Sequence, residues 1–411
     1  FRVTVQSMAC LKNCRLGTRA YWGFTRTDGA LRMLVLLHFY QLGYSPFQIA
    51  LLFLLYEFFG IVTNLLGGWI GSRYGLKLTL TSGLLLQVFA LAGLAQVDAQ
   101  WSELLSIAYV MAMQALSGIA KDLTKMSSKS AIKLVVPENE DSRLFKWVAL
   151  LTGSKNTLKG AGFFLGGLLL SVFGFQNALY VMAGALMLIF IFTQLALRQD
   201  MGRARNKVKF SQLLSRSEQI NLLSAARVFL FGARDIWFVV GLPVYLSAML
   251  DWSDTQVGGF MASWVIIYGM VQAGAPRFVR NKMATAPSGH TARNWVLYLL
   301  LTMLLIAGAM QGGAGPWWLI LGLVIFGALF AINSSVHSYL ILAYTERDHV
   351  AVNVGFYYMA NACGRLLGTL LSGLAYQEFG IEGCLWTASG FLLLSLLFSA
   401  RLANVRPELR V

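Results

Sequence analysis

The feature that most constrains the fold of this chain is a series of long apolar runs with almost no charge. The clearest of them are Leu78–Val97, Ala178–Leu197, Trp317–Ile332 and Leu385–Ala400. Each approaches the ~20 residues that a helix needs to cross a bilayer, and each is too long for a strand of a soluble core. Only 12% of the 411 residues are charged, about half the share that is usual in soluble domains. The runs argue against a soluble all-α protein, whose helices would need polar faces. Counting weaker runs as well, the sequence predicts about twelve membrane spans.

The distribution of basic residues predicts how the chain is oriented. Lys and Arg fall on alternate loops, including a long basic segment at 198–219, whereas the loops between them carry Asp or Glu. Because Lys and Arg accumulate on the cytoplasmic side of membrane proteins, we expect both termini in the cytoplasm and an even number of spans. Residues 1–19 lack the hydrophobic region of a secretory signal, so we expect insertion to start with the first span. This topology accounts for most of the net charge of +15 without any nucleic-acid partner.

The two halves of the sequence resemble each other at an offset of about 206 residues. The matching positions are Asp28 with Asp235, Tyr44–Ile49 with Trp252–Val257, Lys159 with Arg365, and Gly174 with Gly380. Two six-span halves, related by an axis along the membrane normal, are how major facilitator transporters are built. The sequence therefore predicts an all-α membrane protein of the major facilitator fold, with two pseudo-symmetric six-helix bundles. The predicted parts are a cytoplasmic segment 1–19, a first bundle 20–197, a basic linker 198–219, a second bundle 220–402 and a cytoplasmic tail 403–411.

Two glycine-rich motifs stand where this superfamily would have them. The segment 68–77 resembles the signature loop between the second and third spans, with Ser72 in place of the usual Asp. The segment Gly162–Gly167 resembles the motif of the fifth span of exporters, although it lacks the proline. Glycines at such positions also permit close packing of helices. The packing interpretation and the transporter interpretation are compatible.

Ionisable residues inside the spans carry the functional hypothesis. A charge at the bilayer centre costs at least about 3 kcal/mol on the insertion scale. Facing lipid, the cations near mid-span would together cost roughly 15–20 kcal/mol, so they must line water or pair with one another. These cations are Arg32, Lys121, Lys125, Lys159, Arg234 and Arg365. The carboxylates within the spans are Asp28, Glu57, Asp122 and Asp235, too few to neutralise this set together with Lys129, Lys155 and Arg227.

A surplus of buried positive charge predicts an anion-binding site. Arginine binds phosphate-like groups in a bidentate manner, and lysine supplies a mobile point charge. We predict that the substrate contacts Arg32, Lys121, Lys125, Lys155, Lys159, Arg234, Asn361 and Arg365. We predict charge-pairing or coupling roles for Asp28, Glu57, Asp122 and Asp235.

The alternative, which involves no substrate, is that some of these cations extend to the cytoplasmic edge of the membrane. For Lys129 and Arg227 the two interpretations carry equal weight, and His337 is interpreted as a hydrogen-bonded pore residue. The sequence contains no nucleotide-binding loop, metal-ligand cluster or nucleophile–base arrangement. We therefore expect no cofactor, no metal and no enzymatic activity.

Several stretches together resemble the organoarsenical efflux permeases (ArsJ type). They are Tyr21–Phe24, Thr27–Phe39, Gly43–Ala50, Tyr56–Gly60, Lys121–Ser127 and Gly153–Asn156. The resemblance covers essentially the whole chain after about residue 20. It implies export of 1-arseno-3-phosphoglycerate across a bacterial inner membrane, and hence arsenate resistance. It also implies a functional partnership with glyceraldehyde-3-phosphate dehydrogenase, which makes that compound from arsenate. A monomer is expected.

Within this hypothesis, Lys121, Lys125, Lys155 and Lys159 hold one oxyanion, and Arg234 and Arg365 hold the other. Asp28 and Asp235 mainly adjust the arginines, and little proton coupling is needed. Two alternatives stay open on the sequence alone. One is an exchanger of sugar phosphates or other organic phosphates of the same superfamily, and the other is a non-transporting receptor on a carrier fold. A multidrug exporter is disfavoured because its cavity would be acidic and aromatic rather than basic.

Overall fold

The computed structural model describes the backbone of residues 2–74, 76–98, 100–133, 141–197, 217–279, 287–345 and 350–402. Within these ranges the side chains of 2–15, 18, 67–74, 76, 126–133, 141–152, 342 and 350–352 are outside the description. The residues 198–216 of the predicted linker and the predicted tail 403–411 therefore lie outside the described residues. The same holds for the side chains of the 68–76 signature and of Lys129.

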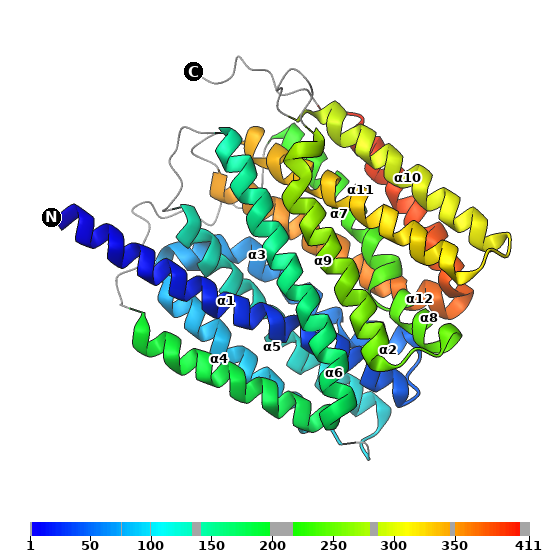
Figure 1. The fold of residues 1–411 in the computed structure, drawn as a ribbon, viewed down its shortest axis with the longest axis horizontal. Helices are drawn as coiled ribbons and strands as arrows, with labels where there is room; N and C mark the ends of the chain where they lie inside the picture. Colours follow the sequence, from blue (N-terminus) through cyan, green and yellow to red (C-terminus); the bar gives the residue numbers. More distant parts are fainter. Residues whose placement is uncertain are drawn as a thin grey trace.

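The regular structure of the described residues is α-helical (Figure 1). The helices are α1 (Arg2–Gln41), α2 (Pro46–Leu52), α3 (Leu54–Tyr74), α4 (Leu76–Leu94), α5 (Glu103–Lys133), α6 (Asp141–Ala196), α7 (Glu218–Phe238), α8 (Gly241–Leu250), α9 (Asp254–Val279), α10 (Gly289–Gln311), α11 (Pro316–Ala343) and α12 (Val350–Ser399). A helix satisfies its own backbone hydrogen bonds, which is what a chain in lipid requires.

Two of these helices each contain two spans. A straight helix with the 56 residues of α6 would be about 84 Å long, far more than a bilayer is thick. The chain departs from helical geometry at Gly174, with φ 71°, and α12 does so at Gly380, with φ 65°. Glycine adopts this left-handed region without the steric penalty that a Cβ atom brings. Gly174 and Gly380 are repeat partners, so both halves make their last turn in the same way.

The number of spans agrees with the prediction. Within the described residues, nine segments are long and apolar enough to cross a membrane, and two of them, of 44 and 47 residues, are the double spans of α6 and α12. Helix α1, which carries Arg26, Asp28 and Arg32, adds the first span. The α2–α3 and α7–α8 pairs each lie within one span. The predicted twelve-span, all-α fold is thereby confirmed.

The repeat also extends to the start of the second span in each half. Ser45 caps helix α2, accepting a hydrogen bond from the backbone of Gln48 at 3.3 Å, while the Gln48 side chain accepts from the Ser45 backbone at 2.7 Å. In the second half, Ser253 and Gln256 exchange the same two bonds, at 3.4 and 2.9 Å. This Ser-x-x-Gln capping box fixes where each helix begins.

The two halves meet through backbones that approach each other closely. Helix α6 packs against α9, and α2 and α3 pack against α12. A methyl group on Gly153 would lie 2.5 Å from the carbonyl oxygen of Gly269, and one on Gly167 would lie 2.4 Å from that of Asp254. Within the same half, a methyl on Gly162 would lie 2.4 Å from the carbonyl oxygen of Arg26. The glycines of the Gly162–Gly167 motif therefore permit close packing, as the packing interpretation of this motif predicts.

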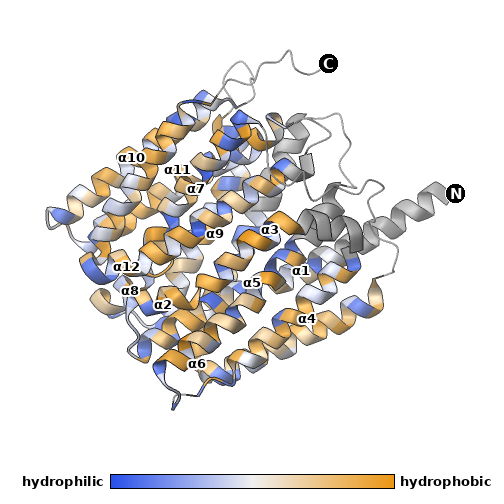
Figure 2. Cartoon of the chain, turned by 180° about the vertical axis from the view of Figure 1, so that it is seen from behind, coloured by the Kyte–Doolittle hydropathy of each residue, from blue (hydrophilic) through white to orange (hydrophobic). Residues whose placement is uncertain are grey.

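Hydrophobic residues dominate the helices (Figure 2). Large apolar side chains remain exposed on the outside of the bundle, for example Leu195 at 83% and Phe379 at 75%. In water such surfaces would be costly, but in lipid they are the required contact. Six charged side chains of the described residues are instead buried, and several of them belong to the site described next.

Candidate functional site

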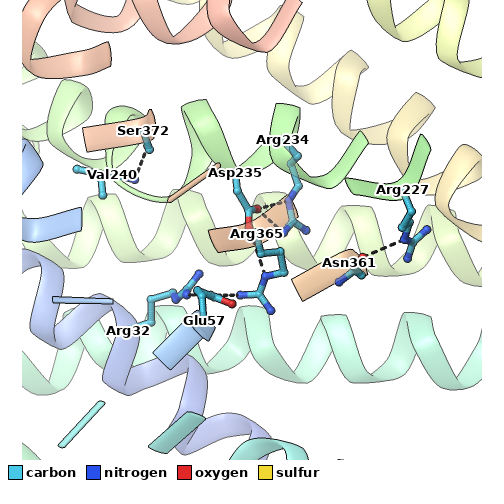
Figure 3. Close-up of polar contacts among 9 residues, drawn as sticks. All are labelled: Arg32, Glu57, Arg227, Arg234, Asp235, Val240, Asn361, Arg365 and Ser372. Atoms are coloured by element: carbon cyan, nitrogen blue, oxygen red, sulfur yellow. Dashed lines mark hydrogen bonds and ion pairs between the residues drawn. The ribbon is translucent and has the colours of Figure 1, made fainter. Parts of the chain in front are cut away.

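Five charged residues at the boundary between the halves form one chain of contacts, which we call the central ion-pair network (Figure 3). Glu57 accepts through its Oε1 atom from Nη2 of Arg32 at 2.5 Å and from Nη2 of Arg365 at 2.6 Å. Asp235 accepts from Nε of Arg365 at 3.3 Å and pairs with the neighbouring Arg234. Three arginines thus share two carboxylates, and the network keeps a net positive charge.

The network joins four spans of the two halves. Arg32 comes from α1 and Glu57 from α3, whereas Arg234 and Asp235 come from α7 and Arg365 from α12. The Arg365–Glu57 contact crosses between the halves. Glu57 is 1% exposed and Asp235 is 0% exposed, while the side chains of Arg234 and Arg365 each keep 16% of their surface exposed. The carboxylates are sealed off and the arginines retain accessible surface.

Two lysines of the first half lie in the field of this network without a carboxylate partner. Lys121 on α5 places its Nζ atom 3.9 Å from the ring centre of Tyr56. Lys159 on α6 lies 5.7 Å from the ring centre of Phe163, and it interacts electrostatically with three cations, Arg32, Arg365 and Lys121, and with the carboxylate of Asp28. Neither lysine forms an ion pair with a residue that the structure describes.

Lys125 and Lys155 differ from these two. Lys125 donates to the side-chain oxygen of Asn64 at 2.7 Å and lies 3.5 Å from Asp122, which also accepts from Thr63 at 2.8 Å. Its ammonium lies 4.7 Å from the ring centre of Tyr358 on α12, a contact between the halves. Lys155, one turn before Lys159 on α6, is half-buried. Of the predicted lysines, Lys121 and Lys159 are therefore the best placed to meet an anion.

Asp28 does not have the partner that its spacing from Arg32 suggests. It accepts a hydrogen bond from the Tyr56 hydroxyl at 2.5 Å, and no arginine among the described residues lies within ion-pair distance of it. Glu57 pairs with Arg32 instead. Of the two aspartates expected to adjust the arginines, Asp235 contacts arginine directly and Asp28 does not.

A second polar group extends from the network into the second half. Nε of Arg227 on α7 donates to the Oδ1 atom of Asn361 at 2.9 Å, and Nη1 donates to the Ser334 backbone and side chain at 3.4 and 3.3 Å. Gln272 donates to the same Ser334 hydroxyl at 3.4 Å and accepts from Asn156 of the first half at 2.6 Å. Asn361 is one turn from Arg365 on α12, so the two predicted substrate contacts of that helix face the same site.

Arg227 is the clearest residue that the sequence hypothesis left undecided. It is 5% exposed and held between helices, so the edge-of-membrane alternative is wrong for it. Asn156 and Gln272 were not singled out, because uncharged amides in apolar helices are common and carry no distinctive spacing. A usable signal was that Arg227 stands seven residues from Arg234, which places both on one side of a helix.

The arrangement of these helices agrees with known proteins. The family model of the Major Facilitator Superfamily matches residues 27–293. The chain belongs to this superfamily. It is therefore a multi-pass membrane transporter. Transporters of this kind bind their substrates between the two repeats, and the cluster of charges described above lies between the two halves of this chain.

Solved structures of other major facilitators share the fold at low sequence identity. They include the human organic anion transporter MFSD10, 15% identical, with a TM-score of 0.68 over 94% of this chain and 99% of that one. The proton:xylose symporter XylE is 13% identical, with a TM-score of 0.70 over 97% of each chain. The nucleoside transporter NupG is 14% identical, with a TM-score of 0.71 over 95% of this chain and 99% of that one. No curated protein matches the sequence significantly.

Proposed function

We propose that this major facilitator exports a small organic molecule with several negative charges, and that the molecule is 1-arseno-3-phosphoglycerate. The observation that carries the proposal is the excess of cations at the boundary between the halves. Six of the predicted cations and four carboxylates lie in this region, and Lys121 and Lys159 form no ion pair with a carboxylate that the structure describes. A permanent positive excess in a low-dielectric interior favours an anionic substrate.

The distribution of the charge supports a substrate with two anionic ends. The lysines belong to the first half, whereas Arg234 and Arg365 belong to the second. A molecule with a phosphate at one end and an arsenate at the other would contact both halves at once. Arginine suits such oxyanions because its planar fork matches two oxygens. Binding of this kind needs charge rather than thiolates, which are the ligands that softer species prefer.

The substrate class also bears on energy coupling. Moving one charge across 100 mV is worth about 2.3 kcal/mol. A substrate with about three negative charges would gain roughly 7 kcal/mol on leaving an interior-negative cell. We therefore expect export to need little proton coupling. The test is transport into inverted vesicles with the membrane potential clamped, where a protonophore should leave the rate unchanged. Collapse of the rate would contradict this part of the proposal.

The direct test is arsenate resistance in a sensitive bacterium that expresses the chain, with and without glyceraldehyde-3-phosphate dehydrogenase. We expect resistance only when both proteins are present. Lys159→Gln and Arg365→Gln should each abolish efflux while the protein still inserts into the membrane, as shown by the amount of purified protein. Arg277→Gln, which removes an exposed arginine of the second half, is the matched control and should keep full resistance. Full resistance with both Lys159→Gln and Arg365→Gln would refute the site.

The same vesicles separate this proposal from its alternatives. The three similar structures carry names for an organic anion, xylose and nucleosides, so the fold does not select the substrate. Accelerated counter-flow with inorganic phosphate, without arsenate resistance, would favour an organic-phosphate exchanger. Binding of organic phosphates with no flux would favour a receptor on a carrier fold.

A further inference from the structure

Arg227 is a buried arginine whose contacts are all neutral. Its partners among the described residues are Asn361, Ser334 and the rings of Phe231 and Tyr357, whose centres lie 3.7 and 5.1 Å from its Cζ atom. No described carboxylate lies within ion-pair distance of it. Burying a charge without a counter-ion is costly, so this position needs a reason beyond packing.

The guanidinium also keeps part of its hydrogen-bonding capacity unused. Arginine has five N–H donors. Here Nε and Nη1 are engaged, but no described residue accepts a hydrogen bond from Nη2. Asn361 and Ser334 hold the group in a fixed orientation from α12 and α11. The result is an oriented cation with free donors, which is what a site for an acidic group requires.

A second, independent observation comes from α11. His337 is 0% exposed, interacts electrostatically with Arg227, and has no hydrogen-bond partner for either ring nitrogen. Asn333, one turn earlier on the same face, is also 0% exposed, and neither atom of its amide has a partner. Buried polar groups are normally hydrogen-bonded. A histidine without a hydrogen-bond partner that interacts with an unneutralised arginine, and an unpartnered amide one turn from that histidine, indicate that a polar ligand completes this region.

The position of Arg227 relates it to the main site. It precedes Arg234 by seven residues on α7, or about 10 Å along the helix axis. Likewise Asn361, which holds it, precedes Arg365 by one turn of α12. Both steps lead toward the ends of the helices that the charge pattern assigns to the cytoplasm. A ligand group at Arg227 would therefore lie on the cytoplasmic side of the central ion-pair network.

We infer that Arg227, with His337 and Asn333, forms a second anion subsite, which binds one acidic group of a substrate whose other acidic group binds at Lys159 and Arg365. This rests on the proposed function and revises how the two anionic ends of the substrate are held: Lys159 and Arg365 bind one acidic group together, and Arg227 binds the other. Asn361 and Ser334 act as positioning residues, because they contact the guanidinium rather than the substrate. His337 and the amide of Asn333 donate to the same acidic group.

The test compares ligands with one and two acidic groups on the purified protein in detergent. The probes are methylphosphonate, with one acidic group, and ethane-, propane- and butane-diphosphonate, with two. We expect the wild-type protein to bind at least one diphosphonate about tenfold or more tightly than methylphosphonate, since a charge-assisted contact is worth at least that. Arg227→Gln should remove this preference and leave methylphosphonate binding unchanged. Lys159→Gln should weaken both classes.

Controls distinguish the subsite from a structural role and from failure of the proposed function. Arg227→Lys keeps the charge and should retain part of the preference, while Arg277→Gln should retain all of it. A purely structural Arg227 would change both ligand classes together, and that result would overturn the subsite. Equal preference in wild type and Arg227→Gln would overturn it as well. If the wild-type protein binds none of the four probes, the proposed function fails together with the subsite.

Discussion

The two halves of this transporter repeat the same scaffold but hold their charges differently. Gly174 and Gly380 make the same turn, and Ser45 and Ser253 cap the same helix. The repeat partners Lys159 and Arg365, in contrast, have different surroundings. Arg365 forms ion pairs with two carboxylates, whereas Lys159 forms no ion pair with a described residue and lies near the ring of Phe163. The turns and helix caps of the repeat are thus the same in both halves, whereas the partners of the charged residues differ.

The aspartates show the same divergence. Asp235 pairs with two arginines, while its repeat partner Asp28 accepts one hydrogen bond from a tyrosine. Unneutralised charge near the central ion-pair network therefore lies on Lys121 and Lys159 of the first half. Arg234 and Arg365 of the second half are held in place by carboxylates, one of which, Glu57, belongs to the opposite half. Arg227 is held instead by the neutral residues Asn361 and Ser334. This difference indicates that the first half supplies lysines whose ammonium groups can move toward an anion. The second half supplies arginines whose orientation is fixed by carboxylates.

The largest effect is expected from Glu57, the carboxylate on which this comparison depends. Glu57→Gln leaves Arg32 without its carboxylate and Arg365 with only Asp235. Removing one partner from a buried ion pair costs about 3–5 kcal/mol. We expect a clear fall in the thermal unfolding temperature in detergent, with partial recovery on adding a diphosphonate, because the freed arginines then bind the added anion.

The control for Glu57→Gln is Glu378→Gln, which removes an exposed carboxylate of the second half and should leave unfolding unchanged. An unfolding temperature equal to that of the wild type for Glu57→Gln would mean that the central ion-pair network contributes no net stability.

The repeat partners Asp28 and Asp235 should respond unequally to the same substitution. Asp235→Asn removes the countercharge of two arginines, so we expect it to cost about 3 kcal/mol. Asp28→Asn keeps an oxygen that can accept from Tyr56, so its cost should stay near 1 kcal/mol. Comparing the two unfolding temperatures measures the asymmetry, and equal losses would show that the halves do not differ electrostatically at this position.

The turns should respond equally in both halves. Gly174→Ala and Gly380→Ala each place a Cβ atom on a residue with positive φ and extended ψ, a region that is nearly restricted to glycine. We expect each to lower stability by about 1–3 kcal/mol. Gly184→Ala, at a helical glycine with open space around it, is the control and should not destabilise. A large difference between the two turn variants would argue against a shared structural role.

The smallest effect is expected at the helix caps. Ser45→Ala and Ser253→Ala each remove the side-chain acceptor at the start of a span, at a cost of about 1 kcal/mol. Because the two capping bonds are the same in both halves, the two losses should agree within the error of the unfolding measurement. Ser-to-Asn variants at the same positions keep an acceptor and should restore stability. Failure of that rescue would indicate that the serines act through packing instead.

Much of the fold could be predicted from the sequence, because the properties that determine it are local. Span length, loop charge and the repeat of turn glycines are all read along the chain, and they predicted the twelve-span bundle. That Asn361 and Arg365 share a face was predictable for the same reason, since a spacing of four residues places them one turn apart on a helix.

The partners of the charged residues could not be predicted in this way. Asp28 and Arg32 share a helix face, but Arg32 pairs with Glu57 of a neighbouring helix. That choice depends on how α1 and α3 pack, which spacing along one helix does not reveal. Arg227 was left undecided for the same reason, because the residues that hold it, Asn361 and Ser334, lie more than a hundred positions away.

The close contact of α6 with α9 has a consequence for motion. From Gly153 to Gly167, a length of about 21 Å, glycines bring the backbone of α6 against that of α9. Side chains also meet across the boundary there, at Asn156 with Gln272 and at Phe163 with Phe238. A larger side chain in place of one of these glycines would push the two backbones apart, and we expect it to hinder the rocking of the halves. Leucine at Gly160, which faces Ala262 and Ile266, should therefore slow turnover far more than it weakens ligand binding.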